Sequence, residues 1–342
     1  MSLGSLRKTL NEEMLRFLWR QWSQLGVARD AQFPDSWIVD PEALLVFTMT
    51  VGRCDPRLFD EVIDWTVRNG RWISLQRLKN IAESADEDTK RVLTAFAAVV
   101  DSHDTKHRWR SILQMHKTED ARQVPLFHDV SGKPLPTIGE PDTHFHERGL
   151  ERSSVVLRGL SVSVPMNPPT NLLFKLRSVF GLAPRAEVAA YLMTHSGGKA
   201  SDIARSTVYS HPAVSEALAE MVQSGLVYMQ KRGFYSLDAD RWARFLEVPP
   251  PLSTWIEWPR AFAALSTLTK AVSDIGEESV SDYLVRSRAL TLNETVRDML
   301  SNTGLPNPFL RPCGLDDATE ALGRRATELA SALNARRPES RG

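Results

Sequence analysis

Two pairs of histidines have spacings at which imidazole side chains could bind a transition metal. His144 and His146 stand two residues apart in THFHER, on one side of what would be an extended strand, with Glu147 beside them. His103 and His107 are four residues apart, which places them on one face if that segment is helical. Neither pair has a third ligand marked by its spacing, and protein zinc sites need at least three. The sequence therefore predicts no metal site and no cofactor, with His144 and His146 as the candidates to test.

Other patterns that could support catalysis are incomplete. Residues 196–201, SGGKAS, contain Gly-Gly-Lys but lack the upstream glycine of a phosphate-binding loop and do not follow a predicted strand. No Gly-x-Ser-x-Gly nucleophile motif occurs in the sequence. The neighbouring carboxylates Asp86, Glu87 and Asp88 suit a helix cap and a first helical turn. These observations favour a non-enzymatic protein over an enzyme.

A third pattern, in residues 201–238, belongs to binding rather than catalysis: SDIARSTVYSHPAVSEALAEMVQSGLVYMQKRGFYSLD. Ser201 is placed to cap a short helix that begins this stretch. Ser210 or His211 is placed to cap a second helix, which has Pro212 in its first turn. Apolar residues recur along that second helix at helical spacing, so one of its faces is expected to be buried.

The end of the same stretch predicts a β-hairpin with a basic turn. Gly225 suits the left-handed end of the second helix, and LVYM then begins a strand. Lys231, Arg232 and Gly233 follow as a turn, and FYSLD returns as the second strand.

Two further helices are expected upstream, at 171–181 and 185–195, and the complete order resembles the winged helix-turn-helix domains of bacterial transcription regulators such as the MarR and ArsR types. The resemblance covers about a quarter of the chain. It implies that the second capped helix enters the major groove of double-stranded DNA, that the hairpin forms a wing, and that the protein works as a homodimer. The residues to which it assigns DNA contact are Lys199, Arg205, Ser210, His211, Ser215, Lys231 and Arg232.

The outward positions of the second capped helix fit this function less well. They include Glu216 and Glu220 and no lysine or arginine, and a phosphate backbone repels carboxylates. Residues 167–246 contain nine basic side chains against six acidic ones, which is a modest surplus. The alternative is a non-catalytic protein-interaction module whose winged helix has lost its contact with DNA.

Composition limits the class of protein. The 342 residues contain 42 basic and 42 acidic side chains, so any attraction to nucleic acid must come from a local patch. The two cysteines, Cys54 and Cys313, lie far apart without metal or disulfide spacing, which suits a reducing compartment. No apolar run is long enough to span a membrane, and the first residues do not form a secretory signal. We expect a cytoplasmic protein that does not bind membranes.

The pattern of apolar residues and breakers predicts a mainly α fold in successive regions. Residues 1–116 are expected to form an all-helical domain of about six helices, and 117–170 an extended segment rich in proline and glycine, with possible short strands at 155–157 and 160–164. The winged helix-turn-helix with its small β-hairpin occupies 171–248, helices follow at 249–337, and 338–342 is a frayed tail. Trp255 and Trp258, after a triple proline, are candidates for a contact between domains or subunits, with a place in the helical core as the alternative.

Overall fold

Six α-helices form the N-terminal part of the chain, in a computed structural model that describes residues 2–27, 36–116, 122–277 and 281–335. Side-chain caps define the start of several of them, because the side chains of Asp40, Asp55 and Asp86 accept hydrogen bonds from amides of the first helical turn. The helices are α1 (Leu3–Gln24), α2 (Pro41–Val51), α3 (Pro56–Asn69), α4 (Leu75–Ala82), α5 (Glu87–Ser102) and α6 (Arg110–Leu113), with short 3-10 turns at Gly52–Cys54 and Gly70–Trp72.

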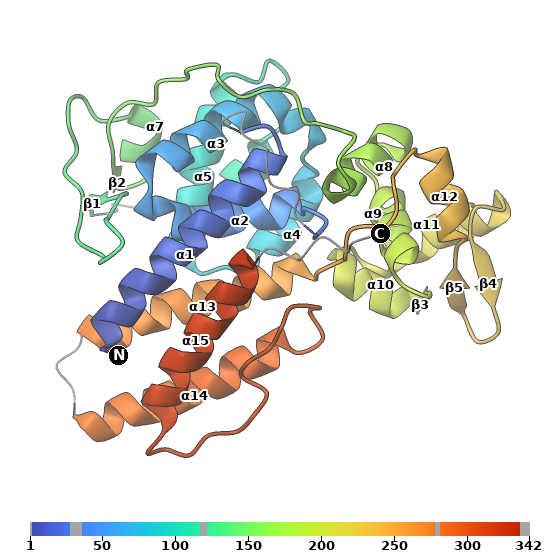
Figure 1. The fold of residues 1–342 in the computed structure, drawn as a ribbon. Coiled ribbons are helices and arrows are strands. Elements are labelled where there is room, and N and C mark those ends of the chain that lie inside the picture. Colours follow the sequence, from blue (N-terminus) through green and yellow to red (C-terminus); the bar gives the residue numbers. More distant parts are fainter. Residues whose placement is uncertain (1, 28–35, 117–121, 278–280, 336–342) are drawn as a thin grey trace.

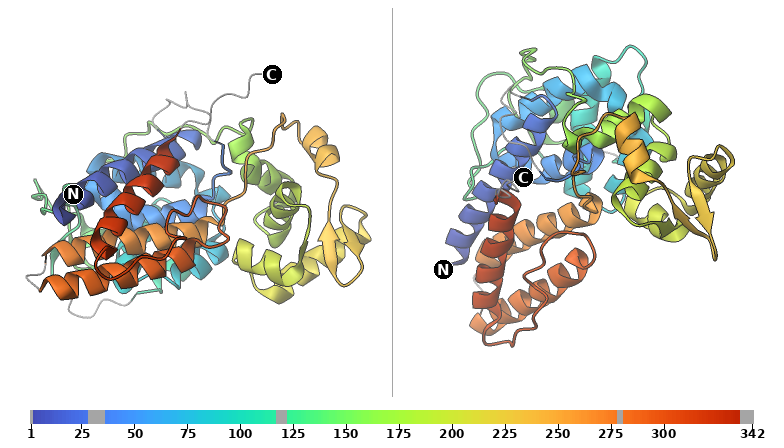
Figure 2. Two further views of the ribbon diagram at one scale, coloured as in Figure 1. Left: turned by 60° about the horizontal axis from the view of Figure 1, so that its bottom comes forward. Right: turned by 45° about the vertical axis from the view of Figure 1, so that its right-hand side comes forward.

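The C-terminal helices share one hydrophobic core with these N-terminal helices. They are α13 (Trp258–Glu277), α14 (Asp282–Leu300) and α15 (Ala318–Asn334). Helices α13 and α15 lie beside α1, α13 also contacts α2, and α14 packs on α13 and α15 (Figures 1 and 2). Phe262 of α13 shows the contact, since its ring stacks on Phe47 of α2 with centroids 4.6 Å apart. We call helices α1–α6 and α13–α15 together the main body.

The segment before residue 170 crosses the surface of the main body (Figure 1). It contains β1 (Val124–Pro125) and β2 (Leu150–Glu151), which pair in parallel, and the short helix α7 (Thr143–His146). The expectation of short strands at 155–157 and 160–164 is wrong. The backbone there bonds to a side chain instead of to another strand. The amides of Gly159 and Ser161 donate to the two carboxylate oxygens of Asp64, at 2.9 and 3.0 Å.

Residues 171–248 form a smaller unit with its own hydrophobic core, which we call the central unit (Figure 1, yellow-green to gold). Its elements are α8 (Leu172–Phe180), α9 (Pro184–Thr194), β3 (Gly198–Lys199), α10 (Ala200–Thr207), α11 (His211–Gln223), β4 (Tyr228–Gln230), β5 (Phe234–Ser236) and α12 (Ala239–Phe245), after a 3-10 turn at Pro169–Asn171. The strands form an antiparallel sheet in the order β3-β5-β4. The predicted mainly α fold with a small β-hairpin is confirmed.

No helix among the described residues is long and apolar enough to cross a membrane. The tail predicted at 338–342 lies outside the residues that the structure describes.

Candidate nucleic-acid interface

The tip of the β4–β5 hairpin carries the densest group of predicted DNA-contacting residues. Lys231 and Arg232 lie in the turn, exposed, and Arg232 has a φ of 66°, a left-handed conformation that a tight hairpin turn requires. Lys199 comes from β3, which precedes α10, and pairs with Phe234, the first residue of β5. Neighbouring strands lie about 5 Å apart, so the fold places Lys199 beside this turn. The register therefore places three basic residues from two separate segments at the same end of the sheet.

Helix α11 presents one free stripe to the solvent. Its other face is buried against α9 and α10 by Val214, Leu218 and Met221. The side chain of Ser210 caps the helix by accepting from the amide of Ala213, as expected, although at the long distance of 3.4 Å. The exposed residues follow helical spacing and are His211, Pro212, Glu216, Ala219, Glu220 and Gln223. The stripe is therefore open to a partner along the length of α11.

One of the two acids on this stripe is neutralised within the central unit. Glu220 accepts hydrogen bonds from the guanidinium of Arg185 on α9, and the two side chains are 45% and 41% exposed. Glu216 has no ion-pair partner among the described residues. The sequence separates Arg185 from Glu220 by 35 positions, so this pairing was not foreseen. The repulsion expected between α11 and phosphate is therefore reduced to one carboxylate.

Other predicted contact residues are placed less favourably. Arg205 forms an ion pair with Asp202 at 3.0 Å on α10. Burial and the negative charges of Asp202 and Glu257 raise the pKa of the Tyr191 hydroxyl, and the charge of Arg205 offsets this only in part. Arg205 is thus exposed but paired. Ser215 is half-buried, with its hydroxyl 3.4 Å from a ring nitrogen of His211. These residues do not join the cationic group at the hairpin.

The prediction that Ser201 caps the first helix of the pair is wrong. Helix α10 begins one residue earlier, at Ala200, and the residue at its cap position is Lys199, which makes no side-chain cap bond. The reason is the third strand, since β3 ends at Lys199 and the backbone passes directly from the sheet into the helix. Residues 196–201 show only an incomplete phosphate-binding pattern in the sequence, so this strand was not predicted.

The turn between α10 and α11 is held by the main body. Helix α4 binds three consecutive residues of this turn, because Arg77 donates to the carbonyl of Thr207 at 2.7 Å and Asn80 to that of Val208 at 3.1 Å. The hydroxyl of Tyr209 lies 3.0 Å from that of Ser74. The start of α11 therefore has a fixed position relative to α4, and a partner must approach it from the opposite side.

A buried ion network joins the two units behind this turn. Glu42 of α2 pairs with Arg77 and also with Arg177 of α8, while Asp40 pairs with Arg77 and Glu187 of α9 with Arg177. Three carboxylates thus share two guanidinium groups, and all five residues are buried. One Oε of Glu187 has no hydrogen-bond partner. A charged cluster of this kind is stable only while each charge keeps its partners, so it fixes the central unit in one orientation.

The pKa values in this network follow burial and pairing. Burial alone pushes the pKa of Asp40 upward, but the adjacent Arg77 outweighs it through its charge and hydrogen bonds, and the pKa falls below its ordinary value. Burial raises the pKa of Glu187, and the two arginines do not offset the effect fully. Arg77 stays protonated, because its carboxylate partners raise its pKa against the effect of burial.

A tryptophan contact also links the two units. Of the two candidates, Trp255 and Trp258, it is Trp255 that makes this contact. The indole nitrogen of Trp255 donates to the hydroxyl of Ser206 on α10, and its ring lies edge-on to Tyr191 with centroids 6.1 Å apart. Trp258 belongs to the core of the main body, where its indole nitrogen donates to the carbonyl of Ile38 at 2.7 Å.

The histidine pairs do not have the geometry expected of them. His144 and His146 lie in helix α7 rather than in a strand, because Asp142 caps that helix by accepting from the amides of His144 and Phe145. Residues two apart in a helix point to different sides. His103 ends α5 and His107 follows in a turn with a φ of 46°. Across the described residues, no cluster of three or more histidine, cysteine or acidic side chains is arranged to hold a metal ion.

Comparison of the chain with protein families, with characterised proteins and with solved structures gave no match.

Proposed function

We propose that the central unit is a winged helix-turn-helix that binds double-stranded DNA, and that the chain is a transcriptional regulator. The observation that carries the proposal is the register of the three-stranded sheet, which brings Lys199 beside Lys231 and Arg232. Helices α10 and α11 join the sheet in the order that this class of domain requires. Cations at a hairpin tip contact phosphates, and phosphate contacts supply much of the affinity for a duplex.

The free stripe of α11 supplies the second part of the interface. In this arrangement the N-terminal half of the helix faces the major groove, where His211 and Ser215 lie toward base edges and the Ser210 cap positions the first turn. The pairing of Glu220 with Arg185 supports the proposal by removing one opposing charge. Glu216 remains compatible with a duplex, since a glutamate accepts a hydrogen bond from the amino group of cytosine.

Two further features belong to the same proposal. A single module of this size buries little DNA surface, so we propose that the protein acts as a homodimer. The free cysteines Cys54 and Cys313 fit a reducing environment, and we propose a cytoplasmic location.

The test is binding of the full chain to a fluorescently labelled duplex of mixed sequence, measured by anisotropy over a series of salt concentrations. Replacing Lys231 and Arg232 together by alanine is expected to weaken binding to every sequence and to lower the slope of log affinity against log salt by about 1.8, the value for two phosphate contacts. The matched control replaces Lys133 and Arg324, two exposed cations outside the central unit, and should leave the slope unchanged. Equal slopes for both variants would remove the hairpin from the interface.

A protein-interaction module is the second candidate function. The observation that favours it is the docking of the α10–α11 turn on α4, which leaves the start of α11 open from one side only, together with the unpaired acid Glu216. This candidate predicts no retention of duplex even at low salt. It also predicts that Glu216→Lys weakens binding of a basic partner, whereas the same change strengthens binding to DNA if the first proposal holds.

A further inference from the structure

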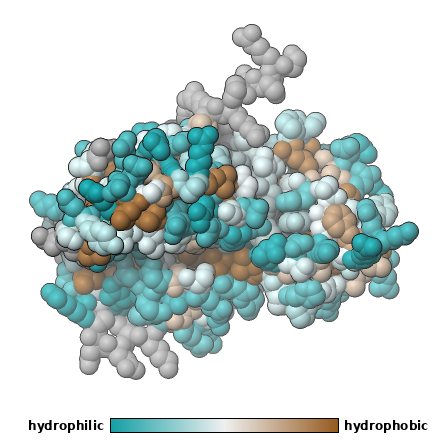
Figure 3. Space-filling model, turned by 90° about the horizontal axis from the view of Figure 1, so that it is seen from below, coloured by the Kyte–Doolittle hydropathy of each residue, from teal (hydrophilic) through white to brown (hydrophobic). Residues whose placement is uncertain are grey.

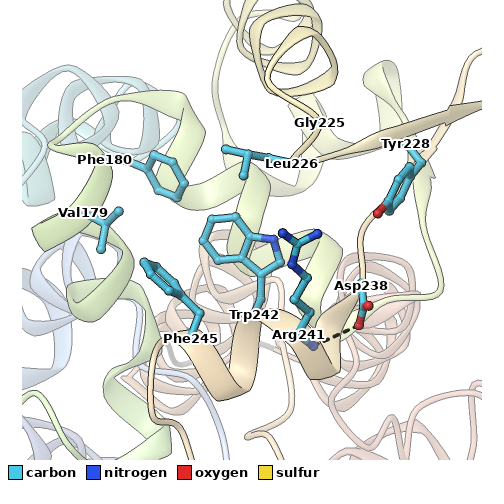
Figure 4. Close-up of a pocket in the computed structure, with 9 residues that line it drawn as sticks. All are labelled: Val179, Phe180, Gly225, Leu226, Tyr228, Asp238, Arg241, Trp242 and Phe245. Atoms are coloured by element: carbon cyan, nitrogen blue, oxygen red, sulfur yellow. Dashed lines mark hydrogen bonds between the residues drawn. The ribbon is translucent and has the colours of Figure 1, made fainter.

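A cavity of about 320 Å³ lies at the base of the hairpin, on the central unit, and neither proposed function uses it. The end of α8, the link between α11 and β4, and helix α12 form its walls (Figure 4). Trp242 lies at its centre and is buried, with the ring of Phe180 5.6 Å from it and that of Phe245 5.8 Å from it, centroid to centroid. The volume is at the lower end of the range for small-molecule sites.

The residues at its mouth leave apolar surface in water. Phe245 is 67% exposed, Tyr228 is 52% exposed and Val179 is 50% exposed. Brown areas interrupt the hydrophilic surface of this unit in the space-filling view (Figure 3, right). A ligand that covered these side chains would gain the free energy of removing their apolar area from water.

One charged group accompanies this apolar lining. The guanidinium of Arg241 lies beside the indole of Trp242 on the cavity side (Figure 4), and no carboxylate or carbonyl among the described residues pairs with it. The other charged residue of the lining, Asp238, is engaged at the start of α12, where its carboxylate caps the helix by accepting from the amide of Arg241 at 2.9 Å. The side chain available to a ligand is therefore a cation in an aromatic setting.

We infer that this cavity binds a small aromatic carboxylate, with its ring against Trp242 and Phe245 and its carboxylate on Arg241. A guanidinium binds a carboxylate through two parallel hydrogen bonds, and these are stronger beside apolar walls than in open water. A ligand seated here contacts Leu226 and Tyr228, which connect the end of α11 to the hairpin. The site stands on its own geometry and does not depend on DNA binding.

Binding of 1-naphthoate to the full chain, measured by isothermal titration calorimetry without DNA, tests the inference. The neutral analogue 1-naphthalenemethanol has the same ring and lacks the carboxylate, so the wild-type protein should bind the acid at least about tenfold more tightly. Arg241→Gln should remove that preference. Arg244→Gln is the matched control, because Arg244 is an exposed arginine of the same helix outside the cavity lining. The affinity of this variant for 1-naphthoate should differ from that of the wild type by less than about twofold.

A second variant tests the apolar contact separately. Phe245→Ala should weaken the binding of the acid and of the alcohol by the same factor, since the substitution removes a ring contact and no charge. The inference is overturned if naphthoate does not bind at roughly millimolar concentration, or if Arg241→Gln binds it as the wild type does. It is also overturned if Phe245→Ala converts a dimer to a monomer in sedimentation while naphthoate fails to bind, because the surface would then be a protein contact.

Discussion

Replacing Arg177 by methionine should destabilise the protein far more than replacing any exposed arginine. Arg177 is fully buried and makes five hydrogen bonds, to both oxygens of Glu42, to the carbonyl of Trp72 and twice to Glu187. The methionine leaves three buried carboxylates with one remaining guanidinium, that of Arg77. Removing one partner of a buried ion pair costs about 3–5 kcal/mol, and we expect a loss of this size in the free energy of unfolding.

The pH dependence follows from Glu187, whose pKa burial raises. The folded protein holds the carboxyl proton of Glu187 more tightly than the unfolded chain does. The contribution of Glu187 to the free energy of unfolding is therefore fully present below its unfolded pKa and is lost as pH rises through its folded pKa. Without Arg177 the folded pKa rises further. The deficit of Arg177→Met is therefore expected to be largest at neutral and alkaline pH and to shrink on acidification.

The measurement is urea denaturation followed by circular dichroism at several pH values. Arg185→Met is the matched control, because its ion pair with Glu220 is solvent-exposed and such pairs contribute about 0–1 kcal/mol. The double variant Arg177→Met/Glu187→Leu restores the original balance of one excess carboxylate in the network and should recover part of the loss. The reasoning is refuted if Arg177→Met unfolds at the same urea concentration as Arg185→Met, or if its deficit does not change with pH.

Three other changes have expected outcomes. Gly197→Ala should cost several kcal/mol in denaturation, because Gly197 has a φ of +136° and a Cβ there would lie 2.5 Å from the carbonyl oxygen of Tyr235; full stability would show that β3 does not pair with β5. Ser210→Ala should cost about 1 kcal/mol through loss of the α11 cap, whereas Ser224→Ala should cost less. Burial raises the pKa of Cys54 to about 11, so its alkylation by iodoacetamide, in a variant lacking the other cysteine, should keep accelerating with pH up to that value; a plateau near pH 9 would contradict this.

Much of the helical architecture could be predicted from local signals. Asp40 followed by Pro41, and Asp55 followed by Pro56, mark helix starts, because a capping carboxylate and a proline in the first turn are both local requirements. The hairpin was predictable from a local signal too, because a glycine in a short turn between two strand patterns favours a tight hairpin turn. In the structure Arg232 and Gly233 both adopt left-handed conformations in that turn. The order of helices and hairpin from 171 to 238 therefore followed from the sequence.

Strand β3 and the ion network could not be predicted in this way. Strand β3 has only two residues, too few for a periodic pattern, and it exists because β5 pairs with it. A sequence signal for the network did exist, because Glu187 is the one charge between Ala186 and Met193, in an otherwise apolar run. A single charge in such a run does not identify its partner, which here includes Arg177 on another helix.

The sequence by itself determined where several of the helices begin, which of their faces are apolar and where the basic turn lies, since each of these depends on residues within a few positions of one another. Tertiary structure alone decided that Lys199 joins the hairpin cations, that Arg185 neutralises Glu220 and that the α10–α11 turn docks on α4. Charge pairing and burial act through space, and the distances that govern them do not exist until the chain has folded.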